Sequence, residues 1–513
     1  MLEMPRKIPR LLWPALPLAY LLYFYGLTTA GMLGPDEPRY ASIGREMARS
    51  GDWITPRLWG QPWFEKPALL YWMTGAGFRL GLSPDLAPRL PVSLLAAGFL
   101  LFFWWILRRE FGSMAAGCAA LILGTSVEWL VFSQVGVTDL PLAVTFSAAM
   151  LLALPWVRKG ETRGLPWAGA LLGLAVLAKG LVPLALAVPL GIAVWRRPLR
   201  AALKAMVLLA VPLVVIALPW YLLCYRANGM AFLHDFFWVH HFERVTSGAL
   251  MHAEPWWFYG KVLLAALLPW TPLILPAARP ALYRDRGRFF LLALVLWGLL
   301  FFSLPVNKLP GYLLPVLPAA AALFGIALQD TPRAAPVLAA CALLLAVFPI
   351  MAPVLPQALA SGLSKVPFPP FRPYWLLPIA AAAAVWLLEA RGRRMAAVFS
   401  IAAGATAGLF YLKITAMPQV DRIASSRLLW QDVAARAGST CVENIHRNWR
   451  YPLNYYSIQP LPECSAEPRS VHIFQIPGQP PRVSPVVPGQ SGPIDPIRVG
   501  IVPSPIVVLP TRE

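Results

Sequence analysis

The sequence predicts an all-α polytopic membrane protein of about 13 transmembrane helices, followed by a small α/β domain outside the membrane. Hydrophobic residues make up 58% of the 513 residues and charged residues only 13%, which is too apolar for a soluble globular protein. Apolar runs of about 20 residues recur along the chain, and each can cross roughly 30 Å of hydrocarbon. Basic residues gather in every second loop between these runs, as the positive-inside rule expects of cytoplasmic loops.

The same rule explains most of the net charge of +20, and the remainder suits anionic membrane lipids, so we expect no nucleic-acid partner.

The first run is too long and too rich in proline and aromatic residues for a cleaved signal, so we expect a retained span. Merging the short runs 165–178 and 180–195 would reverse the topology of everything after them. The predicted spans are 11–31, 89–107, 113–132, 138–157, 165–178, 180–195, 204–223, 260–277, 289–304, 311–328, 335–354, 373–390 and 395–414.

The first outer loop, residues 32–88, contains two predicted short helices. One runs from Asp36 to Gly51, with Pro38 in its first turn and a glycine to end it. The other runs from Pro67 to Leu80 and stops at Gly81. Both are too short or too polar to span, so we expect them to lie in the membrane interface.

Residues 415–513 have a different character from the rest of the chain, because they are polar and lack a run of spanning length. A helix is predicted at 425–437, strands at 471–476 and 497–508, and a proline-rich tail follows Ile476. The sequence therefore divides into a membrane domain, 1–414, and a C-terminal domain, 415–513. Cys441 and Cys464 lie in this second part and would form a disulfide if it is outside the cytoplasm.

Two adjacent carboxylates, Asp36 and Glu37, follow the first span. Charge at a lipid boundary is expensive, which points to a functional site. Asp139 opens the fourth span on the same side and supplies another carboxylate. We interpret Asp36 and Asp139 as catalytic or acceptor-activating groups, while simple capping of the two helices is the alternative.

Several cations share this outer face. Lys66 follows Glu65 between aromatic residues and suits a phosphate, although a snorkelling lysine paired with Glu65 is the alternative. The forked guanidinium of Arg244 can bind two phosphate oxygens at once. The motif Lys308-Leu-Pro-Gly-Tyr312 adds a cation and a phenol, and Lys179 adds a further cation. Carboxylates at one end and cations at the other suit a lipid-linked phosphate substrate.

The outer loop 224–259 contains four of the six histidines, including His240 and His241. Together with Glu65 or Glu243 they are the ligand types of a divalent metal site, zinc or similar. An interfacial belt of aromatic and histidine residues is the alternative.

At these residues the sequence resembles the bacterial aminoarabinose lipid A transferases and, more distantly, the protein O-mannosyltransferases. Both groups are C-type glycosyltransferases. The resemblance covers roughly residues 10–330. It is carried by the motifs Asp36-Glu37-x-Arg39-Tyr40-Ala41, Phe64-Glu65-Lys66-Pro67, Thr138-Asp139, Lys179-Gly180, His241-x2-Arg244 and Lys308-Leu309-Pro310-x-Tyr312.

The resemblance implies transfer of a sugar from a polyprenyl-phosphate carrier, such as undecaprenyl phosphate, with inversion. The site would face the periplasm of a bacterial inner membrane. Asp36 would be the principal catalytic carboxylate and Asp139 its helper, with Glu37, Arg39 and Lys179 as secondary candidates. Lys66, Arg244 and Lys308 would hold the carrier phosphate, beside Tyr312.

The resemblance also implies that Glu65 and His241 meet at a divalent metal. The usual Glu-His pair of the family reads His240-His241 here, which changes the charge at that point. We expect a monomer acting on membrane lipids. The acceptor stays open among lipid A, another glycolipid, a polysaccharide and protein hydroxyls. A transporter or flippase of the lipid-linked sugar and a protein O-mannosyltransferase are the alternative functions.

Overall fold

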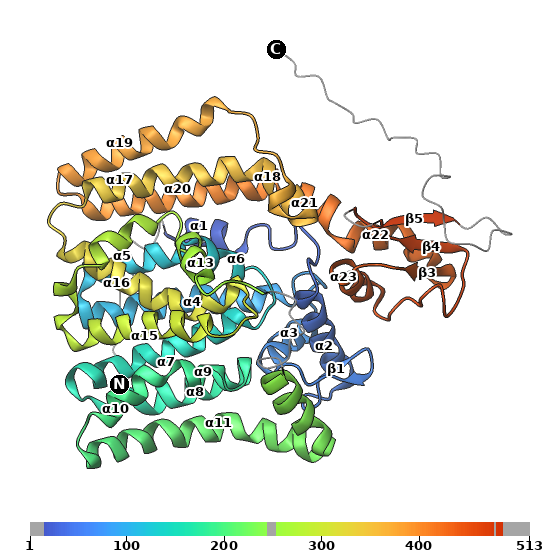
Figure 1. Cartoon of the computed structure of the whole chain (residues 1–513), viewed down its shortest axis with the longest axis horizontal. Helices are drawn as coiled ribbons and strands as arrows, with labels where there is room; N and C mark the ends of the chain where they lie inside the picture. The colour runs from blue at the N-terminus through green and yellow to red at the C-terminus, as the bar shows by residue number, and fades with distance from the viewer. Residues whose placement is uncertain (1–14, 244–252, 477–478, 486–513) are drawn as a thin grey trace.

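The computed structural model describes residues 15–243, 253–476 and 479–485. A body of long helices that run roughly side by side occupies one part of the molecule, and a smaller unit with the strands of the C-terminal region lies beyond one end of it (Figure 1). Between them lie two short helices of the first outer loop, α2 (Asp36–Ser50) and α3 (Leu69–Arg79). Both units therefore meet at the first outer loop.

Eight helices in the described part of the chain are long and apolar enough to cross a membrane, or nine if one bent pair counts as a span. The prediction of a mostly helical protein with many apolar helices is confirmed. These spans are built on α4 (Arg89–Phe111), α7 (Asp139–Lys159), α11 (Leu199–Leu233), α15 (Arg286–Ser303), η7 (Pro310–Val316) with α16 (Leu317–Asp330), α17 (Ala335–Leu343) with α18 (Val347–Ser361), η10 (Pro373–Leu376) with α19 (Leu377–Ala390), and α20 (Arg394–Thr415).

The remaining predicted spans are short or broken, so the count of 13 stays a prediction. In the run 113–132, Thr125 and Ser126 hydrogen-bond their own preceding turn and divide α5 from α6. The pair α13 and α14 is bent by 114°. The elements concerned are α1 (Ala15–Ala19), η2 (Tyr20–Phe24), α5 (Ser113–Gly124), α6 (Val127–Phe132), α8 (Leu165–Lys179), α9 (Val182–Leu186), α10 (Val188–Trp195), α13 (Phe258–Ala266), η5 (Thr271–Leu273) and α14 (Ile274–Ala277).

The helix of the predicted span 204–223 does not end at residue 223. Helix α11 continues to Leu233, and the π-helix η4 (His234–Glu243) extends it. The interruption comes instead at Gly229, whose φ of 63° departs from helical geometry. Aromatic packing explains the extension, because Phe232 lies 5.2 Å from Phe64 of the first loop, ring centre to ring centre.

The two helices of the first outer loop lie close to their predicted bounds. Helix α2 ends at Gly51, which adopts a left-handed φ of 76° as a helix-ending glycine does. Helix α3 packs tightly against α2 at Gly44, where an added Cβ would meet the side chain of Thr74 at 2.7 Å. Glycine at this crossing holds the two helices together at the end of the membrane body.

The C-terminal unit combines helices and a three-stranded sheet of order β3-β4-β5, with β3 and β4 parallel and β4 and β5 antiparallel. The predicted helix at 425–437 and the strand at 471–476 are present as α22 and β4; the strand predicted at 497–508 lies outside the described residues. A disulfide joins Cys441 of β3 to Cys464. The elements are α21 (Met417–Ala424), α22 (Ser426–Val433), β3 (Thr440–Glu443), α23 (Arg447–Ser457), β4 (Val471–Phe474) and β5 (Arg482–Pro485).

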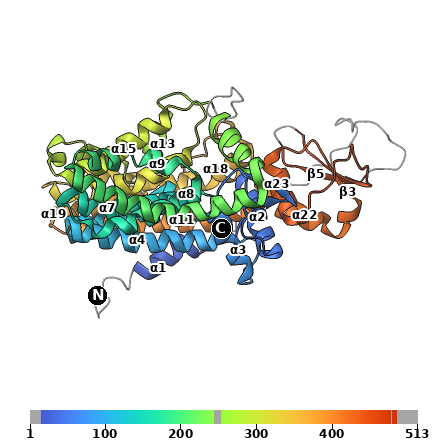
Figure 2. The same cartoon turned by 90° about the horizontal axis from the view of Figure 1, so that it is seen from below.

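Polar bonds dock this unit onto the first outer loop, and Figure 2 shows α23 close to α2 from below. Arg427 pairs with Asp85 at 2.9 Å and with Asp421 at 2.6 Å, and also donates to the carbonyls of residues 28 and 29. The Tyr456 hydroxyl donates to Asp85 at 2.7 Å. Helix α23 is thereby held beside α2.

Candidate active site

Asp36 begins α2 at the end of the helical body. Its Oδ1 accepts a 2.5 Å bond from Arg39, one turn further along the helix. Its side chain is 47% exposed, and among the described residues its other oxygen has no hydrogen-bond partner. The predicted catalytic carboxylate is thus anchored by one oxygen and open at the other.

Arg39 joins Asp36 to the next motif. The same guanidinium nitrogen lies 3.1 Å from Glu65. Burial acts to lower the pKa of Arg39, but the surrounding negative groups, led by Glu65, raise it above its ordinary value overall. The guanidinium therefore stays charged and bridges two carboxylates.

Three aromatic rings surround that guanidinium. Its carbon lies 5.4 Å from the ring centre of Tyr40, 5.6 Å from Trp63 and 5.5 Å from Tyr451. Tyr451 belongs to α23 in the C-terminal unit, so that unit contributes to the site. Cation–π contacts of this kind fix the arginine in one orientation.

Glu65 and Lys66 lie on the loop before α3. Glu65 is buried, and its carboxylate lies 3.4 Å from the Lys66 ammonium. The packing of Phe64 on Phe232 brings the start of η4 to this motif. The backbone of His240 and His241 belongs to η4, while Arg244 lies outside the described residues. The structure therefore sets the helix of the predicted metal ligands beside the loop of Glu65.

Glu37 does not simply charge the first helical turn. It is 2% exposed and forms a two-bond ion pair with Arg89, at 2.8 and 2.7 Å. The oxygen that bonds Arg89 at 2.8 Å also accepts from the backbone N–H of Gly136 at 2.9 Å. Arg89 in turn donates to three carbonyls that precede α2. This buried clamp ties the segment of Asp36 to the segment that leads into Asp139.

Asp139 is held by a second set of residues. Its Oδ1 lies 2.6 Å from the ammonium of Lys179, and its side chain is 17% exposed. Lys179 also lies 4.5 Å from the ring centre of Tyr312. The predicted candidates Asp139, Lys179 and Tyr312 thus form one cluster, in which the carboxylate is paired and largely covered.

Lys308 is buried and donates to the backbone carbonyl of Glu254 at 2.9 Å. The carbonyl of the next residue, Leu309, accepts a bond from Tyr259 at 3.1 Å. An ammonium carries three donors, so Lys308 keeps two for a ligand such as phosphate.

Sequence reasoning missed three groups around these residues. Trp63 and Tyr451 flank Arg39, and the distance between 39 and 451 in the chain hid the second. Glu128, in the short helix α6 and within the predicted span 113–132, is buried with both carboxylate oxygens lacking a hydrogen-bond partner among the described residues. A charged residue inside an apolar run is the signal by which the sequence could have identified it.

Known families and sequences match the chain in the region of these residues. The family model described as dolichyl-phosphate-mannose-protein mannosyltransferase matches residues 65–222. An undecaprenyl phosphate-alpha-4-amino-4-deoxy-L-arabinose arabinosyl transferase of Pseudomonas fluorescens is 34% identical over 62% of this chain and 56% of its own length. One of Sodalis glossinidius is 38% identical over 60% of this chain and 57% of its own length. The chain thus spans less than two thirds of these relatives.

Solved structures match over a longer stretch. ArnT from Cupriavidus metallidurans bound to undecaprenyl phosphate aligns with a TM-score of 0.73 and 25% identity, over 90% of this chain and 93% of that one. The arabinosyltransferase EmbB from Mycobacterium smegmatis shares the fold at a TM-score of 0.52 and 15% identity, over 89% of this chain and 44% of that one. In sequence and fold the chain is therefore similar to the aminoarabinose transferases, and its residues 65–222 match the protein mannosyltransferase family model.

Proposed function

We propose that the protein is a membrane glycosyltransferase that moves a sugar from a polyprenyl-phosphate carrier to an acceptor on the periplasmic face of a bacterial inner membrane. The observation that carries this proposal is the state of Asp36. It is half exposed, it is held through one oxygen by Arg39, and its second oxygen is open to a ligand. An anchored carboxylate with an open oxygen is suited to orient an acceptor and take its proton.

The transfer is a single displacement with inversion. An acceptor oxygen attacks the anomeric carbon from the face opposite the phosphate, and the bond from that carbon to the phosphate oxygen breaks. A hydroxyl acceptor gives its proton to Asp36, whereas an ionised phosphate acceptor needs only orientation. The bonding electrons leave with the carrier phosphate.

Cations stabilise the charge that develops on the leaving phosphate. Lys66 and Lys308 lie among the described residues, and Arg244 follows η4 in the sequence. We assign the carrier phosphate to these three residues, with Tyr312 beside them. Lys308 keeps two donors for this role because one bond goes to Glu254.

Asp139 has a supporting role in this scheme. Its carboxylate is paired with Lys179 and is less exposed than that of Asp36. The clamp of Glu37, Arg89 and Gly136 links the two aspartate segments. We therefore assign acceptor activation to Asp36 and positioning to Asp139.

The relatives' names and the ArnT complex suggest undecaprenyl phosphate as the carrier. For the acceptor we propose a lipid A-type glycolipid, as the resemblance of the site motifs implies. Residues 1–414 would form the membrane domain and 415–513 a periplasmic domain. The disulfide of Cys441 and Cys464 supports this placement, because such bonds persist in oxidising compartments. We propose that the protein acts as a monomer.

We also propose that Glu65, His240 and His241 hold one divalent ion, such as zinc. Carboxylate and imidazole are zinc ligands, and η4 packs beside the loop of Glu65. The ion would supply positive charge near the phosphate. Metal analysis of the purified protein before and after dialysis against EDTA tests this. Less than one ion per chain before dialysis contradicts it.

The test of function uses the full chain in nanodiscs with an undecaprenyl-phosphate sugar donor, and mass spectrometry of glycolipid and protein acceptors. We expect transfer by the wild type and a loss of at least about 100-fold in Asp36→Asn, with unchanged yield. Movement of the donor across the bilayer without consumption would favour the flippase. Modified protein hydroxyls would favour a protein mannosyltransferase.

A further inference from the structure

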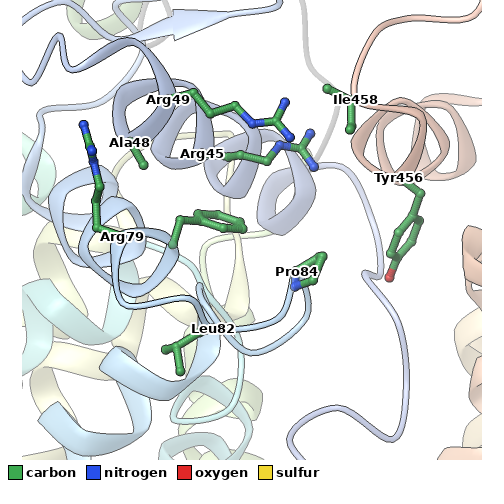
Figure 3. Close-up of a pocket in the computed structure, with 9 residues that line it drawn as sticks. Arg45, Ala48, Arg49, Arg79, Leu82, Pro84, Tyr456 and Ile458 are labelled. Carbon is green, nitrogen blue, oxygen red and sulfur yellow. The ribbon is translucent and has the colours of Figure 1, made fainter.

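A basic pocket lies between the first outer loop and the C-terminal unit, away from Asp36. It consists of two adjoining cavities of about 330 Å³ and 490 Å³. Both are lined by Arg45 and Arg49 of α2 and by Ile458, which follows α23. Figure 3 shows the first cavity, with the side chains of Arg45 and Arg49 extending in the same direction and Arg79 of α3 on its other side.

Among the described residues, the arginines of this pocket lack carboxylate partners. None of Arg45, Arg49 and Arg79 lies in an ion pair there, whereas Arg89, the other buried arginine, is paired with Glu37. Arg45 is 8% exposed and contacts the ring of Tyr455 at 4.4 Å. Because Arg45 is buried, its lack of a carboxylate partner is not explained by solvation of its guanidinium in bulk water.

The arginines also repel one another. Arg45 and Arg49 are four residues apart on one helix, and like charges at this spacing are destabilising. Burial, together with the charge of Arg49, lowers the pKa of Arg45. An anion between them would relieve both costs.

The second cavity adds hydrogen-bond donors. Ser42 is 4% exposed, and neither its hydroxyl nor the indole N–H of Trp59 has a partner among the described residues. Unpaired buried polar groups are costly, so a ligand oxygen would satisfy them. The one carboxylate in the lining, Glu46, already accepts from the backbone N–H of Gly60 at 3.1 Å.

The rest of the first cavity is apolar, with Phe78, Leu82 and Pro84 in its wall. This combination suits an anionic group attached to a larger, partly apolar molecule. Arg45 and Arg49 follow Asp36 by nine and thirteen residues on the same helix, which corresponds to roughly 14–20 Å along its axis.

We propose that this pocket binds a phosphate group of an anionic lipid, at a site separate from the carrier-phosphate site. The lipid is either the acceptor, held by a second phosphate while its reacting end meets Asp36, or a phospholipid of the surrounding membrane. The first source rests on the proposed function, whereas the second does not.

The test compares two double variants of the full-length protein. Arg49→Gln with Arg79→Gln removes two exposed pocket arginines and leaves the buried Arg45 in place. Arg422→Gln with Arg436→Gln removes two exposed arginines outside the pocket and matches the change in charge. Binding of phosphatidylglycerol and of a bis-phosphorylated disaccharide lipid, each against phosphatidylcholine, is measured by native mass spectrometry.

We expect the pocket variant to bind at least one phosphate lipid about tenfold more weakly or worse, because it loses charge-assisted hydrogen bonds from two guanidinium groups to the phosphate. The control should bind as the wild type. Loss of glycolipid binding with a raised KM for that acceptor identifies the acceptor. Loss of phosphatidylglycerol binding alone identifies membrane phospholipid. Unchanged binding of both lipids, or equal losses in the control, would overturn the proposal, and this readout does not depend on transfer activity.

Discussion

The guanidinium carbon of Arg39 lies 5.5 Å from the ring centre of Tyr451, and the same side chain donates to Asp36 at 2.5 Å. An aromatic ring from the C-terminal unit therefore helps to orient the arginine that anchors the proposed catalytic carboxylate. The ring of Tyr451 is itself stacked on Trp59, with the two ring centres 5.6 Å apart.

Replacing this ring should lower activity without unfolding the protein. A partly buried cation–π contact is worth about 1–2 kcal/mol, so we expect Tyr451→Leu to lower kcat roughly 5- to 30-fold. Tyr451→Phe keeps the ring and should retain most activity. Transfer assays on both variants, with yields matched by size-exclusion chromatography, check this. Equal losses in the two variants would show that the hydroxyl, not the ring, is what counts.

The buried pair of Glu37 and Arg89 should matter for stability. Removing one member of a buried ion pair leaves the other charge uncompensated, which costs about 3–5 kcal/mol. We expect Glu37→Gln to lower the thermal midpoint of the purified protein strongly. The exposed Glu161→Gln serves as the control. The double variant Glu37→Gln with Arg89→Met should recover part of the loss, and a midpoint like that of the wild type in the single variant would refute the clamp.

Asp139 and Lys179 should act as a unit. The 2.6 Å bond between them predicts that Asp139→Asn and Lys179→Met each lower kcat by about tenfold or more. The double variant should lose much less than the product of the two, because the second change removes a partner already lost. A double-mutant cycle on transfer rates measures this coupling. Additive losses would mean that the two residues act separately.

Local signals in the sequence predicted the elements that depend on local chemistry. Pro38 lies in the first turn of α2 and Gly51 ends this helix, as the sequence predicts. Long apolar runs predict α4, α7 and α20. The extension of α11 past residue 224 was not predictable in this way, because it depends on Phe232 packing on Phe64 of a distant segment.

The sequence predicts which charged residues belong to the site, but it does not predict which residues they contact. Asp36 and Asp139 stand out as charges at the ends of apolar runs, and Lys66 stands out as a cation between aromatic residues. The partners that give each its role do not, because Arg39 meets Tyr451 and Glu37 meets Arg89 only after the chain folds. From the sequence alone, a role in the first helical turn explains Glu37 as well as a role in the site does. The buried contacts of Glu37 with Arg89 and Gly136 distinguish these two interpretations.

The docking of α23 on the first outer loop constrains how this protein can be recombined with its relatives. A hybrid that joins residues 1–414 to the C-terminal region of a relative would keep every proposed catalytic and phosphate-binding side chain. It would nevertheless lose the contacts between Tyr451 and Arg39, between Tyr455 and Arg45, and between Arg427 and Asp85, unless the incoming region carried equivalent residues. The two regions of the chain are therefore exchangeable only as matched partners.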